Sequence, residues 1–122
     1  MQIDVFTLLP HAFSWLTEQR PLAAVLGSEL ELKLLNYRDF TPLSGGQVDD
    51  EPYGGGAGMV LRPEPVATAL DELRAPDSLV ILLDPGGEVF RQARAADLAT
   101  RSHLLLVCPR YEGIDERIRS LV

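Results

Sequence analysis

The sequence predicts an α/β fold, a parallel sheet with flanking helices, on two observations. Segments with strand character alternate along the chain with segments of helical period, which is the pattern of repeated strand-helix-strand units. A length of 122 residues suits one domain, and a composition that is 46% hydrophobic and 24% charged excludes a disordered chain. We therefore expect a single domain over residues 1–122.

The first part of the chain supplies two strands and a helical region between them. Residues 2–9 are apolar or β-branched and stop at a proline, as expected for a strand that leads into a helix. Helical spacing over residues 13–26 is interrupted by Pro21 and followed by a glycine, which ends it. Apolar and charged residues alternate over 30–34, which predicts a second, half-buried strand.

A long loop follows, because residues 38–61 show no period and hold six of the ten glycines. A loop of this length in a compact chain is functional or disordered. Behind it, Val66, Leu70 and Leu73 recur at helical spacing after two prolines, which predicts a helix.

The second half repeats a strand, a turn and a helix. Residues 79–83 and 104–108 are short apolar runs without alternation, as expected for strands that are covered on both faces. A helix is predicted over residues 89–100, and another amphipathic helix begins at Ile114. The apolar stripe of the first of these helices is predicted to hold Val89, Ala93 and Ala96.

Charge and cysteine content narrow the function classes. Eighteen acids against 11 bases give a net charge of -7, which argues against a general nucleic-acid coat and against an anionic membrane partner, although residues 91–122 are locally basic. The single cysteine, Cys108, excludes an internal disulfide and is expected as a buried thiol. No signal peptide and no apolar run of about 20 residues are present, so we expect a cytoplasmic protein without a membrane partner.

Two turns at neighbouring strand ends predict a site. Ligands of parallel sheets bind outside the carboxyl ends of the strands, and residues 84–87 and 109–113 follow two such ends. The charged side chains of residues 110–117 either are solvated surface residues without a function or belong to this site. Their position at the end of a strand favours the site. Asp115 and Arg119 have the i, i+4 spacing of a helical ion pair, which adds about 0.3 kcal/mol.

The glycine-rich segment at residues 48–60 is the most unusual in the chain. Glycines let a backbone approach a ligand closely, whereas the alternative is a flexible surface loop with solvated acids. The segment lacks the Lys-Ser or Lys-Thr of a phosphate-binding loop. His11 and His103 are expected to be structural, and no zinc-ligand spacing occurs, so no metal site is expected.

Four segments together resemble the bacterial tRNA (guanine-N1)-methyltransferases, a family of the SPOUT superfamily of knotted methyltransferases. Residues 9–13 resemble the family's Phe-Pro-x-Met-Phe, and residues 36–41 its Asn-x-Arg-Asp-Phe-Thr. Residues 48–60 match Val-Asp-Asp-x-Pro-Tyr-Gly-Gly-Gly-x-Gly-Met-Val throughout, and residues 110–117 match Arg-Tyr-Glu-Gly-Ile-Asp-Glu-Arg. Two long motifs in the right order make the resemblance specific.

The resemblance implies a SPOUT-type trefoil-knot α/β domain, a homodimer with active sites at the subunit interface, and S-adenosyl-L-methionine as methyl donor. The substrate implied is tRNA, methylated at N1 of the guanosine on the 3′ side of the anticodon, position 37. Cofactor-binding residues carried over are Leu83, Asp84, Pro85, Pro109, Tyr111, Glu112 and Gly113. Substrate-binding residues carried over are Asp50, Tyr53, Gly54, Gly55, Gly56, Ala57, Gly58 and Arg110.

The resemblance also implies that part of the enzyme lies beyond this chain. The family's proposed general base is an aspartate that follows the position of Val122, as do the rest of the knot and the C-terminal tRNA-binding domain. Glu112 is expected to support catalysis. We therefore expect residues 1–122 to be an N-terminal SPOUT methyltransferase domain that is truncated at its C-terminus and inactive alone.

The chain departs from the family pattern at both turns. Asp84-Pro85-Gly86-Gly87-Glu88 stands where the family has Ser-Pro-Gln-Gly-Arg, which adds negative charge beside a cationic sulfonium. Pro109 stands where the family has glycine and removes a backbone N–H. One alternative is therefore a non-catalytic knotted module that binds a cofactor or nucleotide. A plain α/β phosphate-binding domain is a second alternative, disfavoured because neither a lysine nor a glycine set that opens a helix follows Leu83.

Overall fold

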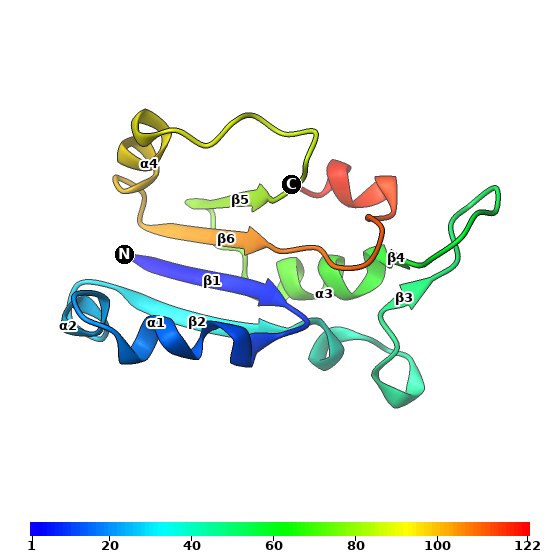
Figure 1. The fold of residues 1–122 in the computed structure, drawn as a ribbon, viewed down its shortest axis with the longest axis horizontal. Helices are drawn as coiled ribbons and strands as arrows, with labels where there is room; N and C mark the ends of the chain where they lie inside the picture. The colour runs from blue at the N-terminus through cyan, green and yellow to red at the C-terminus, as the bar shows by residue number, and fades with distance from the viewer.

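A four-stranded sheet organises the computed structural model, which describes residues 1–122 (Figure 1). The strands lie in the order β2-β1-β6-β5, and every neighbouring pair is parallel. They are β1 (Gln2–Thr7), β2 (Glu31–Asn36), β5 (Ser78–Leu82) and β6 (His103–Val107). The predicted parallel α/β sheet is thus confirmed, and the strand positions agree closely with the sequence patterns.

Helices and 3-10 turns connect the strands. The longest helix is α3 (Pro63–Leu73), which begins at two prolines as predicted and contacts η2 (Tyr37–Phe40) and η4 (Glu116–Ser120). The helical region predicted over residues 13–26 is present as short pieces interrupted at Pro21. These elements are η1 (Pro10–Phe13), α1 (Ser14–Glu18), α2 (Leu22–Val25), η2 (Tyr37–Phe40), η3 (Ser44–Gly46), α3 (Pro63–Leu73), α4 (Gln92–Leu98) and η4 (Glu116–Ser120).

A small hairpin lies within the long loop predicted over residues 38–61. β3 (Asp49–Asp50) pairs antiparallel with β4 (Val60–Leu61), and the glycine-rich segment forms the connection between them. In Figure 1 this hairpin projects beyond the carboxyl ends of the sheet strands. It places the glycines at the same end of the molecule as the predicted site.

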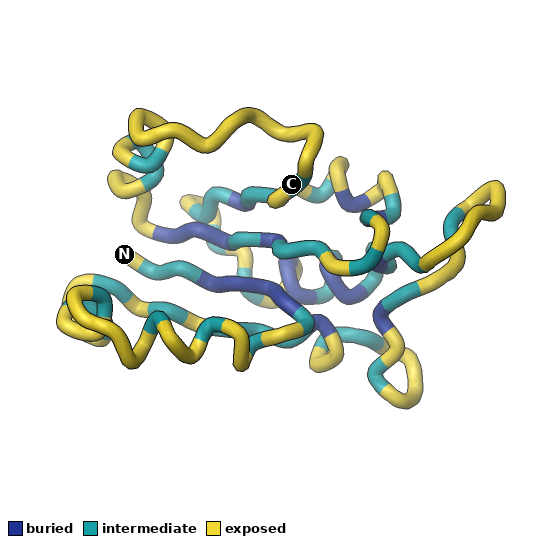
Figure 2. Tube along the Cα trace, in the orientation of Figure 1, coloured by how far each residue is buried: buried dark blue, intermediate teal, exposed yellow.

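The core lies between the sheet, α3 and the last turn of the chain (Figure 2). β6 is a central strand that is buried at four of its five positions, which explains why its sequence shows no alternation. The edge strand β2, by contrast, alternates between exposed and half-buried residues at its start. The buried members of the core are Phe6, Tyr37, Val48, Leu61, Val66, Ala69, Leu70, Val80, Leu105, Val107, Ile114 and Ile118.

The helix predicted over residues 89–100 is shorter than expected, because α4 begins only at Gln92. Its predicted apolar stripe is wrong: Val89 precedes the helix and is 73% exposed, and both Ala93 and Ala96 are exposed. Small alanine side chains mark a helix face weakly. The large apolar side chain of α4 is Leu98, which is half-buried and lines the hollow beside β5.

Three further expectations need correction. β5, predicted to be covered on both faces, is an edge strand in which Val80 is its one buried residue. The helix predicted from Ile114 is the 3-10 turn η4, although Ile114 and Ile118 are buried as an amphipathic segment requires. Cys108 follows the end of β6 and is half-buried rather than buried, and burial raises the pKa of its thiol.

The two histidines lie away from the carboxyl ends of the strands. His103 is buried at the start of β6, where its Nδ1 lies 2.7 Å from Ser78 Oγ and its Nε2 lies 3.3 Å from Asp4 Oδ2. His11 is exposed in η1. No group of three or more His, Cys, Asp or Glu side chains is placed to hold a metal ion. No helix has the length and apolar character that crossing a membrane requires.

Candidate functional site

The two predicted turns leave the sheet side by side. Leu82 is the register partner of Val107 at the carboxyl ends of β5 and β6. The Leu83 N–H donates to the Val107 carbonyl oxygen at 3.0 Å, which extends the pairing one residue past the strand. Residues 84–87 and 109–113 therefore start from adjacent points on one edge, as the sequence predicted.

The first turn is organised by the carboxylate of Asp84. Its Oδ1 accepts from the Gly86 N–H at 2.7 Å, and its Oδ2 lies 3.0 Å from Arg119 Nη2. The Gly86 N–H, and after it Arg119, hold the pKa of Asp84 below its usual range. Leu83 and Pro85 beside it are exposed. The extra acid at this turn is therefore ionised and already paired with a cation of the same chain.

The second turn is shaped by Tyr111, which has a φ of +69° and is the one non-glycine residue with positive φ. Such a conformation is uncommon for a bulky side chain, and strained conformations of this kind cluster at active sites and ligand-binding turns. Tyr111 is half-buried, and burial, followed by the nearby carboxylate of Asp49, raises its pKa. Pro109 and Gly113 are half-buried in the same turn, whereas Arg110 is exposed and forms no ion pair.

The glycine hairpin is joined directly to this second turn. The Glu112 N–H donates to the Met59 carbonyl oxygen at 3.2 Å, and the Leu61 N–H donates to the Gly113 carbonyl oxygen at 3.1 Å. The Asp115 N–H donates in turn to the Leu61 carbonyl oxygen at 3.0 Å. The two motifs singled out by the sequence, far apart along the chain, thus form one hydrogen-bonded unit.

The tip of the hairpin is open to solvent. Residues 54–56 are exposed, with φ values of +88°, +81° and +132°, and the Tyr53 side chain is 87% exposed. Ala57 and Gly58 are exposed as well. These conformations are accessible to glycine and strained for other residues, so the glycines are required by the backbone path of the hairpin.

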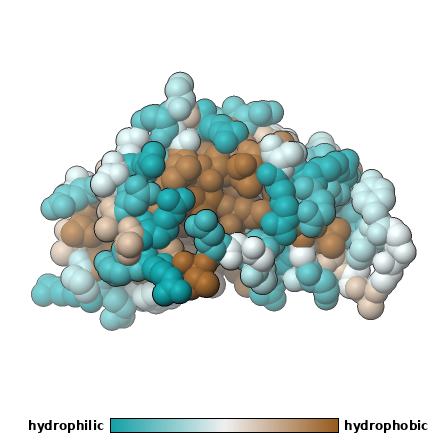
Figure 3. Space-filling view, turned by 90° about the horizontal axis from the view of Figure 1, so that it is seen from above, coloured by the Kyte–Doolittle hydropathy of each residue, from teal (hydrophilic) through white to brown (hydrophobic).

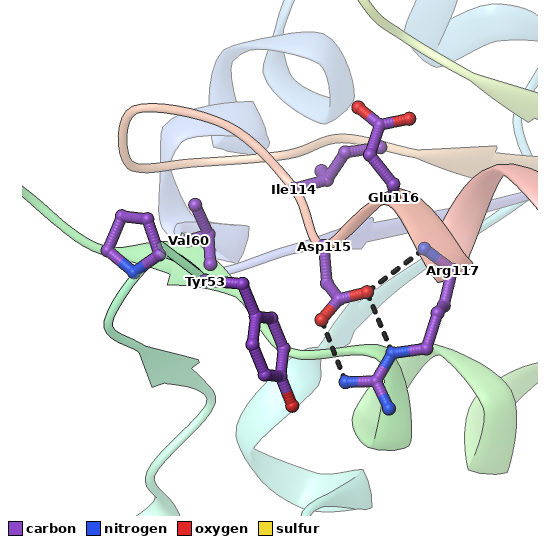
Figure 4. A pocket seen from close by; sticks show the side chains of 7 residues that line it. Tyr53, Val60, Ile114, Asp115, Glu116 and Arg117 are labelled. Carbon is purple, nitrogen blue, oxygen red and sulfur yellow. Dashed lines mark hydrogen bonds and ion pairs between the residues drawn. The ribbon is translucent and has the colours of Figure 1, made fainter. Parts of the chain in front are cut away.

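A hollow of about 500 Å³ lies between the hairpin and η4 (Figure 4). Arg117 forms a bidentate pair with Asp115, with Nε at 2.9 Å from Oδ1 and Nη2 at 2.8 Å from Oδ2. The guanidinium carbon lies 5.7 Å from the centre of the Tyr53 ring, within the range of a cation–π contact. The hollow is lined by Pro52, Tyr53, Val60, Ile114, Asp115, Glu116 and Arg117.

Sequence reasoning mistook one pairing in this region. The expected ion pair between Asp115 and Arg119 is absent, because η4 is not an α-helix and Asp115 caps it by accepting from the Arg117 N–H. Arg119 pairs instead with Asp84 and with Glu116, at 3.0 and 2.8 Å. Its partner in the first turn is distant in sequence, so spacing could not reveal it.

Arg62 is a site residue that sequence reasoning missed. Its Nη1 lies 2.7 Å from Asp50 Oδ2, and its Nε lies 3.2 Å from Glu64 Oε2. The family resemblance predicts that Asp50 binds substrate. In the structure, Asp50 pairs with this arginine at the base of the hairpin. The position of Arg62 between β4 and the prolines of α3 was the one feature of the sequence that could have indicated this role.

A second hollow, of about 610 Å³, adjoins the first turn. β5, residues 83–90, α4 and the end of the chain surround it, and Figure 3 shows apolar side chains gathered in a hollow of this face. Leu83 and Asp84 line its rim together with Val89 and Phe90. It provides an apolar wall directly beside the Asp84 turn.

Comparison with known proteins identifies the family to which this chain belongs. A family model described as tRNA (Guanine-1)-methyltransferase TrmD matches residues 1–122. The chain belongs to this family. A tRNA (guanine-N(1)-)-methyltransferase of Dictyoglomus turgidum is 44% identical over 123 residues, which cover 100% of this chain and 50% of the relative. The corresponding protein of Geobacillus kaustophilus is 43% identical over 122 residues and is likewise covered to 50%.

Solved structures agree with this assignment. The crystal structure of the tRNA (m1G37) methyltransferase from Aquifex aeolicus superposes with a TM-score of 0.83 at 35% identity, covering 100% of this chain and 56% of that one. The SPOUT-type fold class predicted from the motifs is thus confirmed. The chain spans about half the length of the curated relatives it matches.

Proposed function

We propose that this chain is part of a tRNA (guanine-N1)-methyltransferase that acts on the guanosine at position 37. The observation that carries the proposal is the hydrogen-bonded junction of the two family motifs, at Met59–Leu61 and Glu112–Asp115, at the carboxyl edge of the sheet. Family membership over all 122 residues supports the same reaction.

The residues around the first turn fit S-adenosyl-L-methionine as the methyl donor. When bound, this group supplies a methyl carried on a sulfonium. Nine of the 14 residues around the hollow beside Asp84 are hydrophobic, which suits a flat ring that must be kept from water. Because Arg119 neutralises Asp84, the added acid does not place an uncompensated charge there. We propose that Leu83, Asp84, Pro85, Pro109, Tyr111 and Gly113 form this binding surface, together with the backbone of Glu112.

The hairpin and its neighbours suit the nucleic-acid side of the reaction. Tyr53 presents an exposed ring on which a base can stack, and Arg110 presents an unpaired guanidinium suited to phosphate. We propose that Asp50 positions the hairpin through Arg62, whereas residues 53–58 approach the target guanosine with backbone alone.

Transfer to N1 requires removal of the N1 proton, because neutral guanine is a poor nucleophile at that atom. Glu112 lies at the junction and is proposed to support catalysis indirectly, through the position of the hairpin and without contact with the reacting atoms. The general base is proposed to be an aspartate of the segment that follows position 122 in the family. Residues 1–122 alone are therefore expected to transfer no methyl group. We further propose that the enzyme is a homodimer that acts in the cytoplasm.

The test is methyl transfer from labelled S-adenosyl-L-methionine to tRNA transcripts. The full-length protein is expected to label a transcript with guanosine at position 37 and to leave one with adenosine there unlabelled. Reverse transcription locates the product, because a methyl on N1 blocks base pairing. Labelling elsewhere, or no labelling by the full-length protein, contradicts the proposal.

Pro109 favours one alternative, a module that binds the cofactor without catalysis. Proline lacks the N–H that a glycine would offer a ligand at this strand end. Calorimetry with S-adenosyl-L-methionine, run beside the transfer assay on the same full-length protein, separates the two: binding without turnover supports the module.

A further inference from the structure

Glu112 contacts the glycine hairpin through its side chain as well as its backbone. Its Oε2 accepts from the Met59 N–H at 2.8 Å, whereas its own N–H donates to the Met59 carbonyl oxygen. One residue of the second turn therefore satisfies both polar groups of one residue of the hairpin. No other exposed side chain of the turn holds the hairpin in this way.

Gly58 makes room for this carboxylate. A Cβ built on Gly58 would lie 2.6 Å from Glu112 Oε2 and 2.7 Å from its Cγ, closer than real contacts allow. At Gly54, Gly55 and Gly56 a Cβ would meet nothing within 4 Å. Gly58 is thus the glycine of the tip whose missing side chain is required by a neighbour as well as by its positive φ.

The contact lies where the hairpin could otherwise move. Residues 54–58 are exposed and Glu112 is itself exposed, so burial does not hold them together. Backbone bonds at Leu61 and at the Met59 carbonyl oxygen fix the base of the hairpin, and the bond from the Met59 N–H to the Glu112 carboxylate is the next link toward the tip.

We propose that Glu112 is a positioning residue that clamps the glycine hairpin onto the second turn and so sets the place of the hairpin relative to bound tRNA. The expected effect on tRNA binding rests on the proposed function, whereas the contact between Glu112 and the hairpin does not. Loss of the clamp frees Met59 and the tip, which weakens tRNA binding more than cofactor binding. A glutamine at position 112 preserves the clamp, because its side-chain oxygen accepts the same bond.

The structural test is amide hydrogen exchange at Met59 in the full-length protein. Exchange is expected to accelerate by about tenfold in Glu112→Ala and in Gly58→Ala, and to stay near the wild-type rate in Glu112→Gln. Gly55→Ala is the matched control, because its φ of +81° is close to the +94° of Gly58 but its Cβ meets no neighbour. Unchanged Met59 exchange in Glu112→Ala, or equal acceleration in Gly55→Ala, overturns the clamp.

A double substitution gives a second test. If the alanine at position 58 acts by displacing the Glu112 carboxylate, adding Gly58→Ala to Glu112→Ala accelerates exchange no further. Effects that multiply instead show that Gly58 and Glu112 act separately, which contradicts the proposal.

The functional test separates the clamp from a charge contact with the cofactor. In the methyl-transfer assay, Glu112→Ala is expected to raise the KM for tRNA by about tenfold with a much smaller change in the KM for S-adenosyl-L-methionine, and Glu112→Gln is expected to restore the tRNA KM. The positioning role is overturned if Glu112→Gln is as impaired as Glu112→Ala and if the KM that rises is the one for S-adenosyl-L-methionine. Absence of transfer by the wild type counts against the proposed function instead, and leaves the exchange result to decide the clamp.

Discussion

Ile118 is the anchor of η4, and its truncation tests whether the arginine-bearing turn is part of the core. The side chain is 0% exposed and belongs to the main apolar cluster, although both neighbouring residues are charged and exposed. Removing three carbons from such a site costs the transfer free energy of those carbons and leaves a cavity. Ile118→Ala is therefore expected to lower the free energy of unfolding by about 2–5 kcal/mol, and Ile118→Val by about 1 kcal/mol.

Urea unfolding monitored by circular dichroism measures this loss. Val89→Ala is the matched control, because it shortens an aliphatic side chain that is 73% exposed, and its effect should stay within about 0.5 kcal/mol. The midpoint should fall in Ile118→Ala without a large change in the slope. A loss below about 1 kcal/mol would refute the placement of η4 against the core.

Three further predictions concern the strand-end turns. Asp84 has a lowered pKa, so its contribution to stability is present above its ordinary pKa of about 3.9 and is lost as pH falls through the folded-state value. The difference in unfolding free energy between wild type and Asp84→Asn should accordingly shrink toward zero in urea titrations taken to low pH, and a constant difference would contradict the pairing. Pro109→Gly restores a backbone N–H and should tighten S-adenosyl-L-methionine binding in calorimetry; equal or weaker binding would show that this N–H is not used. Burial raises the pKa of Cys108, so iodoacetamide should alkylate it more slowly at pH 8 than it alkylates a free thiol, and equal rates would count against that burial.

The strands were predictable because their patterns reflect local burial. Residues 104–107 form a continuous apolar run, and β6 is indeed covered on both faces. The two turns followed from the strands, since parallel strands deliver their carboxyl ends to one edge. α4 was predicted less well, because alanines carry little periodic signal and residues 84–91 remain outside any helix.

The contacts within the site were not predictable in the same way. The motifs named Gly58 and Glu112 separately, but the bond from the Met59 N–H to Glu112 joins residues 53 positions apart. The pairing of Arg119 with Asp84 spans 35 positions and replaced the local partner that spacing suggested. Such contacts depend on the folding of several elements together, which a pattern along the chain does not record.

The position of β5 has a practical consequence for anyone who purifies residues 1–122. β5 has one neighbour, so a row of backbone N–H and C=O groups along an apolar segment faces outward without partners. Strands of this kind recruit strands from other molecules. The polypeptide should therefore self-associate as its concentration rises, and light scattering across a dilution series is the first quality control to run on any sample.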